Sequence, residues 1–132
     1  MAMNNPRFRR LAVREDLAAV HAIYTHPRVV PYLGYDPMPL EEFESIFAGL
    51  LATGAFFVAI HEGLVRGFYR VNRQRGRSRH VAILETLAVA PAEHGTGFAM
   101  EMVGEALDAM VADGILRVEL MVEADNPRGI SF

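Results

Sequence analysis

The segment from Val89 to Ala99 constrains the fold most, because an apolar strand there runs through a glycine-bearing turn directly into an amphipathic helix. Pro91 stops the strand, and Gly95 and Gly97 lack the Cβ that would hold a ligand away from the backbone. The first turn of the following helix presents unpaired N–H groups at the positive end of the helix dipole. The segment therefore predicts a backbone site for a phosphate or pyrophosphate group.

Hydrophobic periodicity divides the rest of the chain into strands and helices. Apolar residues at every second position predict strands, and apolar residues three and four apart predict amphipathic helices. The predicted order is strand 7–13, helix 15–24, helix 40–54, strand 55–60, strand 64–71, strand 81–89, helix 98–112 and strand 116–122. The three consecutive strands predict an antiparallel meander. The helix 98–112 is expected to bury Phe98, Met102, Val103, Ala106, Leu107, Met110 and Val111.

The glycine turn resembles the cofactor loop of the GNAT superfamily of acetyl-CoA-dependent N-acetyltransferases. That loop reads Arg or Gln, two residues, Gly, one residue, then Gly or Ala. Here the stretch reads His94-Gly95-Thr96-Gly97-Phe98-Ala99, with His94 in the place of Arg or Gln. The stretch from Leu116 to Pro127 is similar to the fifth strand of such enzymes, followed by Asn126, which opens their next helix.

The resemblance implies an α/β (α+β) fold, the GNAT-like acyl-CoA N-acyltransferase fold. It has a mixed, mostly antiparallel twisted sheet flanked by helices, in the order β-α-α-β-β-β-α-β. It also implies one N-acetyltransferase domain over residues 1–132. In the family a Leu-Tyr or Phe-Tyr pair follows, and Phe132 fills its first place. We therefore expect a chain truncated before the C-terminal helix and the last two strands.

The same resemblance implies acetyl-CoA as cosubstrate, bound between the fourth and fifth strands. Backbone groups of the segment Leu87, Ala88 and Val89 are expected to meet the pantetheine and the thioester. The coenzyme phosphates are expected on His94, Gly95, Thr96, Gly97, Phe98 and Ala99, with Asn126 as a further contact. The His94 side chain either reaches a phosphate or covers the loop.

Glu85 is the candidate general base. It is expected on the same strand face as Val81, Ile83, Leu87 and Val89. A carboxylate that loses water on an apolar face becomes a better proton acceptor, which suits deprotonation of an amine. Two alternatives remain open: this face meets solvent, or Glu85 pairs with an arginine.

The segment around Tyr32 and Tyr35 lies between the first two helices, where the family builds one wall of its acceptor pocket. Both tyrosines are candidates for substrate contact, and Asp36 is placed to attract an ammonium group. The alternative is that these loop aromatics only pack as a lid. The resemblance is closest to bacterial members that acetylate amino acids, small amines or protein N-termini.

Composition excludes several other classes of protein. All 13 basic residues are arginine, so Schiff-base lysines and the phosphate lysine of P-loop NTPases are absent. There is no cysteine, so the acceptor amine is expected to attack the thioester directly. The five histidines show no metal-ligand spacing, and no metal is expected. A dinucleotide fingerprint would need a third glycine where Met100 stands.

Two features leave the partners open. The run Arg70, Arg73, Arg75, Arg77 and Arg79 indicates either a solvated hairpin turn or a surface for an acidic partner. The net charge of −3 argues against nucleic acid as a partner, and no window is apolar enough for a membrane span.

We expect a cytoplasmic protein and a homodimer in which a second copy covers the fifth strand. The rival hypothesis is a coenzyme-binding or structural remnant without turnover.

Overall fold

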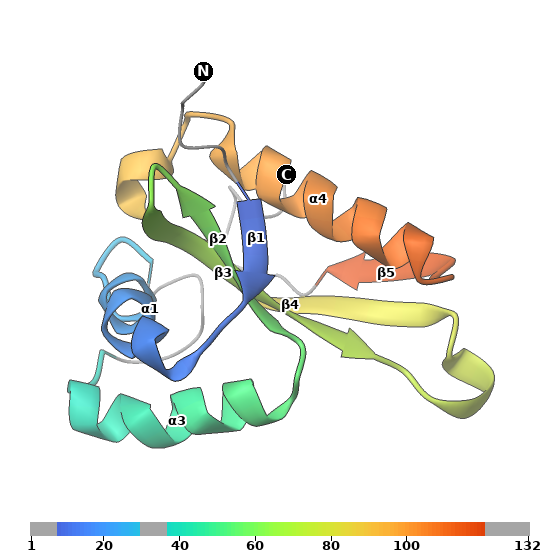
Figure 1. The fold of residues 1–132 in the computed structure, drawn as a ribbon, viewed down its shortest axis with the longest axis horizontal. Coiled ribbons are helices and arrows are strands. Elements are labelled where there is room, and N and C mark those ends of the chain that lie inside the picture. The colour runs from blue at the N-terminus through green and yellow to red at the C-terminus, as the bar shows by residue number, and fades with distance from the viewer. Residues whose placement is uncertain (1–7, 30–36, 121–132) are drawn as a thin grey trace.

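The computed structural model describes residues 8–29 and 37–120 of the chain (Figure 1). The helices and strands follow in the order β1 (Phe8–Leu11), α1 (Leu17–Tyr24), α3 (Leu40–Ala52), β2 (Phe56–His61), β3 (Leu64–Arg73), β4 (Val81–Val89), α4 (Phe98–Ala112) and β5 (Arg117–Leu120). Short 3₁₀ turns lie at Arg14–Asp16, Gly76–Ser78 and Pro91–Glu93. This order confirms the one predicted from the sequence.

The strands form one mixed sheet in the order β1-β2-β3-β4-β5. The first four are antiparallel neighbours, as expected of hairpin-connected strands. The chain then crosses through α4 and returns as β5, which pairs parallel to β4 with Val81 opposite Arg117 and Leu84 opposite Leu120. The crossover leaves the Gly95–Gly97 turn at the carboxyl end of β4, where the helix begins.

Helices cover both faces of the sheet (Figure 1). On one face, α1 and α3 pack an aromatic cluster against β2 and β3, in which the Tyr24 and Phe43 rings lie 4.7 Å apart. On the other face, α4 packs against β3 and β4. The predicted core face of α4 is partly wrong, because Leu107 and Val111 are 38% and 69% exposed. The buried residues of α4 are Phe98, Met102, Val103, Ala106 and Met110.

α1 begins two residues later than predicted, because a 3₁₀ turn that ends at Asp16 precedes it. The buried Asp16 carboxylate accepts hydrogen bonds from Arg10 Nη1 and Nη2 at 2.7 and 2.8 Å and from the Val13 N–H at 2.8 Å. Burial raises the pKa of Asp16, but these hydrogen bonds outweigh burial and hold the pKa below its usual value. The regular helix therefore begins at Leu17.

A bulge at Thr86 interrupts the alternation of β4. Thr86 has a φ of 50°, and the pairing with β3 changes register there. Leu87 and Val89 consequently pack with the α4 cluster, whereas Ala88 belongs to the α1–α3 cluster. Glu85 follows Leu84, which also packs on the α4 side, so it faces the α1–α3 side. The expectation that Glu85 shares a face with Leu87 and Val89 is therefore wrong. No helix in the described ranges is long and apolar enough to span a bilayer.

Candidate functional site

The predicted phosphate loop follows the 3₁₀ turn Pro91–Glu93 and leads into α4. Gly95 and Gly97 have φ values of 79° and 88°, in the left-handed region that residues with a Cβ rarely adopt. A Cβ built on either glycine would meet no atom of the described chain within 4 Å. The left-handed backbone conformation therefore explains why both positions are glycine. Close contacts with other described residues do not explain it.

The loop and the first turn of α4 hold several free backbone donors. The N–H groups of Gly95, Gly97, Ala99 and Met100 form no hydrogen bond with any described residue. The Phe98 N–H is different, since it donates to Thr96 Oγ1 at 3.2 Å, and the Phe98 side chain is buried. Free donors at the amino end of a 15-residue helix attract an anion. The loop thus has the backbone that phosphate binding requires.

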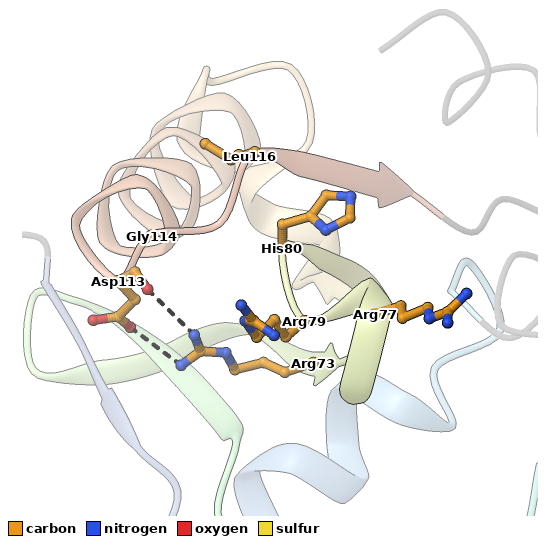
Figure 2. A pocket seen from close by; sticks show the side chains of 7 residues that line it. All are labelled: Arg73, Arg77, Arg79, His80, Asp113, Gly114 and Leu116. Carbon is orange, nitrogen blue, oxygen red and sulfur yellow. Dashed lines mark hydrogen bonds and ion pairs between the residues drawn. The ribbon is translucent and has the colours of Figure 1, made fainter.

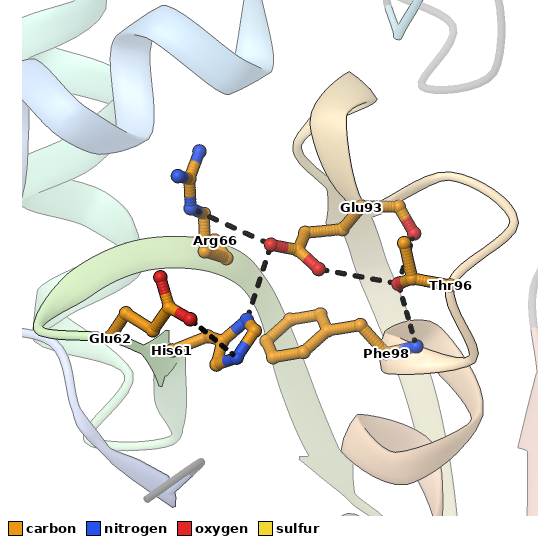
Figure 3. A network of polar contacts seen from close by, with 6 residues as sticks. All are labelled: His61, Glu62, Arg66, Glu93, Thr96 and Phe98. Atoms are coloured by element: carbon orange, nitrogen blue, oxygen red, sulfur yellow. Dashed lines mark hydrogen bonds and ion pairs between the residues drawn. The ribbon is translucent and has the colours of Figure 1, made fainter. Parts of the chain in front are cut away.

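Glu93 lies beneath this loop and is 7% exposed (Figure 3). Its Oε1 accepts a hydrogen bond from the Thr96 hydroxyl at 3.2 Å, and the same hydroxyl lies 2.8 Å from the Glu93 carbonyl oxygen. Its Oε2 lies 3.3 Å from His61 Nδ1 and 3.6 Å from Arg66 Nε. A carboxylate below a phosphate loop would repel the ligand, and the Arg66 guanidinium beside it offsets that charge.

His61 connects the network to the helix that follows the loop. Its ring stacks on the Phe98 ring at 5.7 Å between centroids (Figure 3). Sequence analysis missed Glu93 and did not connect it with His61 or Arg66. The only signal was an acidic residue next to the loop, because its partners lie about thirty positions earlier, in the β2–β3 hairpin.

The free edge of β4 lies beside the loop. The Ala90 N–H donates to the Arg66 carbonyl in β3 at 2.7 Å, so the preceding Val89 carbonyl points away from β3. His94 Nε2 lies 3.3 Å from that Val89 carbonyl oxygen, which places the imidazole against the end of β4. Within the described residues the β4–β5 pairing ends at Leu84, so Leu87–Val89 lies beyond the paired part of the strand.

Glu85 pairs with an arginine, one of the two alternatives open from the sequence. Arg70 Nη1 donates to Glu85 Oε1 at 2.7 Å across the β3–β4 pair, and the two side chains are 30% and 18% exposed. Glu85 Oε2 has no hydrogen bond to the described part of the chain. The guanidinium thus fixes the orientation of the carboxylate and leaves one oxygen as a proton acceptor.

Other predicted site residues fall outside the described residues. These are Tyr32, Tyr35, Asp36 and Asn126, whose roles stay predictions. Among the described side chains, no three His, Asp or Glu residues are grouped closely enough to hold a metal ion.

Comparison with known proteins adds independent findings. A model described as the acetyltransferase (GNAT) family matches residues 17–132. PaiA N-acetyltransferase from Thermoplasma acidophilum, solved with coenzyme A, is 20% identical, with a TM-score of 0.77, covering 97% of this chain and 86% of that chain.

Spermidine N-acetyltransferase from Vibrio cholerae, solved with CoA and spermine, is 21% identical, with a TM-score of 0.77, covering 95% of this chain and 76% of that chain. An N-acetyltransferase from Staphylococcus aureus Mu50 is 22% identical, with a TM-score of 0.74, covering 96% of this chain and 79% of that chain. The search of curated proteins finds no match. At these identities the solved structures confirm the predicted fold.

Proposed function

We propose that this chain, which belongs to the acetyltransferase (GNAT) family, transfers an acetyl group from acetyl-CoA to a primary amine. The acceptor is a small molecule, an amino acid or a protein N-terminus. Family membership supports acetyl transfer, and the observation that carries coenzyme binding is the Gly95–Gly97 loop with its free N–H groups at the start of α4. Two solved proteins of the same fold contain coenzyme A.

The reaction is direct attack of the amine nitrogen on the thioester carbonyl carbon. A C–N bond forms, the C–S bond breaks with its electron pair passing to sulfur, and the sulfur takes up a proton. The chain has no cysteine, so no acyl-cysteine intermediate is available. The amine proton passes to Glu85 Oε2, directly or through a water, while Arg70 orients the carboxylate. Backbone groups of Leu87–Val89 face the thioester.

The first experiment tests coenzyme binding by thermal unfolding with and without acetyl-CoA. We expect the coenzyme to raise the melting temperature of the parent chain. Gly97→Glu is expected to abolish this shift, because it places bulk and negative charge where the pyrophosphate would lie. Gly54→Glu is the matched control, since Gly54 also has a positive φ and open space around it but lies at the end of α3. Equal shifts in both variants would place the coenzyme elsewhere.

The second experiment separates an enzyme from a coenzyme-binding remnant. Thiol release from acetyl-CoA is measured with a panel of amines and amino acids. Glu85→Gln is expected to lower kcat by about 10²- to 10⁴-fold, as loss of a general base does, and to leave the KM for acetyl-CoA within about threefold. Glu44→Gln, on the exposed side of α3, is the control. Coenzyme binding without turnover on any amine would favour the remnant.

The quaternary structure is also a proposal. In the described residues β5 is an edge strand, and Leu116 just before it and Leu120 at its end are 83% and 40% exposed. An unpaired strand edge next to exposed leucines is suited to pairing with a second copy, so we propose a homodimer through β5. Light scattering that gives a monomer at high concentration would refute it. The assignment of residues 1–132 to one domain and the cytoplasmic location also stay predictions.

A further inference from the structure

A pocket with different chemistry lies at the other end of α4 (Figure 2). It forms where the β3–β4 hairpin meets the end of α4 and the start of β5, and its volume is about 640 Å³. Its lining consists of Arg73, Arg77, Arg79, His80, Asp113, Gly114 and Leu116. Since α4 has 15 residues, this pocket lies about 22 Å along the helix from the Gly95–Gly97 loop. It is therefore separate from the proposed coenzyme site.

One of the lining arginines has a structural role. Arg73 Nη2 donates to the Asp113 carbonyl oxygen at 3.3 Å, and its Nη1 lies 3.8 Å from Asp113 Oδ2. A cation at the carboxyl end of a helix satisfies the last carbonyls and the helix dipole. This explains Arg73 without any ligand, and it leaves the other cations of the pocket unexplained.

Arg77 and Arg79 have no such explanation. Neither guanidinium forms a hydrogen bond or an ion pair with the described residues. Figure 2 shows the Arg79 side chain between Arg73 and His80, whereas Arg77 extends away from them at the rim. The backbone presents Arg79 in a fixed turn, because the Arg79 N–H donates to the Gly76 carbonyl at 3.2 Å. Among the described residues that line the pocket, Asp113 is the only acidic one.

We propose that this pocket binds a phosphate-bearing small molecule. Arg73 at the end of β3 and Arg77 and Arg79 in the following turn line one space. A tetrahedral phosphate accepts hydrogen bonds from several directions, whereas a planar carboxylate matches one guanidinium fork. Leu116 is 83% exposed at the same pocket and offers an apolar contact to the organic part of the ligand. The volume lies within the range of small-molecule sites.

Phosphate groups also occur in nucleic acids, so the source must be distinguished. The chain carries a net charge of −3, which disfavours the extended phosphate backbone of DNA or RNA. A pocket lined by three arginines instead suits one or two phosphate groups. A free phosphorylated molecule is therefore the ligand source that the charges favour.

The test is calorimetric titration of the full chain with inorganic pyrophosphate, and with a short single-stranded oligonucleotide as the second arm. Saturating coenzyme A is present so that the Gly95–Gly97 loop is filled. We expect pyrophosphate to bind and the affinity to fall at high salt. Arg79→Ala is expected to weaken binding by about tenfold, the usual effect of removing one charge-assisted hydrogen bond.

Two further variants make the test specific. Asp113→Asn is expected to tighten pyrophosphate binding, because it removes the negative charge that competes for Arg73. Arg28→Ala, an exposed arginine elsewhere, removes the same charge and is expected to change nothing. The inference is overturned if pyrophosphate does not bind, if Arg28→Ala and Arg79→Ala have equal effects, or if Gly97→Glu alone abolishes binding. Tighter, Arg79-dependent binding of the oligonucleotide would also overturn it in favour of nucleic acid.

Discussion

Substitution of Gly67 by alanine tests how α4 is seated on the sheet beside the proposed coenzyme loop. Gly67 lies opposite Val89 in the β3–β4 pair. A Cβ at this position would lie 2.8 Å from Met102 Sδ, 3.1 Å from the Ala88 carbonyl oxygen and 3.1 Å from Val89 Cγ1. Favourable contacts between heavy atoms lie at about 3.5–4.0 Å, so all three neighbours would have to move. The Ala88 oxygen belongs to the backbone and moves least easily.

The expected effect combines two opposed contributions. Overpacking a buried site costs about 1–3 kcal/mol, whereas replacing glycine gains about 0.4–1 kcal/mol by restricting the unfolded chain. We therefore expect Gly67→Ala to lower the free energy of unfolding by about 1–2 kcal/mol, which in a chain of this length lowers the melting temperature by about 3–10 °C. Because Met102 is one turn after Phe98, the displaced helix is also expected to raise the KM for acetyl-CoA more than it lowers kcat.

Gly104→Ala is the matched control, on the helix that packs against Gly67. A Cβ at Gly104 would meet no described atom within 4 Å. In a helix interior this substitution is expected to stabilise the protein by about 0.5–1 kcal/mol. Urea unfolding followed by circular dichroism measures both variants. If Gly67→Ala stabilises the protein as Gly104→Ala does, the tight contact beneath α4 does not exist and the reasoning fails.

Two other substitutions test the turns that precede α1 and α4. Asp16→Asn is expected to cost about 1–2 kcal/mol at neutral pH, because Asp16 loses its charge opposite Arg10, which is itself partly exposed. The pKa of Asp16 is lowered by folding, so its stabilisation is present above the unfolded value and is lost as the pH falls through the folded value; urea titrations should therefore show the parent and variant converging below about pH 4. Thr96→Val removes the acceptor of the Phe98 N–H and is expected to raise the KM for acetyl-CoA by about tenfold, while Thr96→Ser keeps the hydroxyl and the parent KM. Equal KM values in Thr96→Val and Thr96→Ser would show that the hydroxyl does not shape the loop.

The elements were predictable because their signals are local. The bounds of β4 and α4 agree with the sequence prediction, since apolar periodicity, Pro91 and the Asp113-Gly114 pair mark their ends. The exposure of Val111 was not predictable in the same way. An apolar residue fits the helical spacing at that position, but its burial depends on which part of α4 packs against the sheet.

The contacts within the site depended on long-range pairing. Glu93 acquires His61 and Arg66 only after the β2–β3 hairpin is placed next to the turn that follows β4. The Arg70–Glu85 pair depends on the register of β3 against β4, which both strands and the turn between them set together and which shifts at the bulge. Sequence reasoning could therefore name Glu85 as a candidate and leave the arginine as an alternative, without deciding between them.

The bulge at Thr86 explains how one strand can serve two different tasks in the proposed reaction. A threonine at a φ of 50° is uncommon, because β-branched residues avoid the left-handed region. Since the bulge has no glycine, the sequence gives no local signal that predicts it. In a regular strand Leu87 would lie on the same face as Glu85. The extra residue instead turns Leu87 and Val89 toward the α4 core and leaves Glu85 on the opposite face with Arg70. Backbone strain of this kind is concentrated at functional sites. The bulge at Thr86 places Glu85, the proposed proton acceptor, on one face of β4. The main-chain groups proposed to meet the thioester begin at Leu87, two residues further along the same strand.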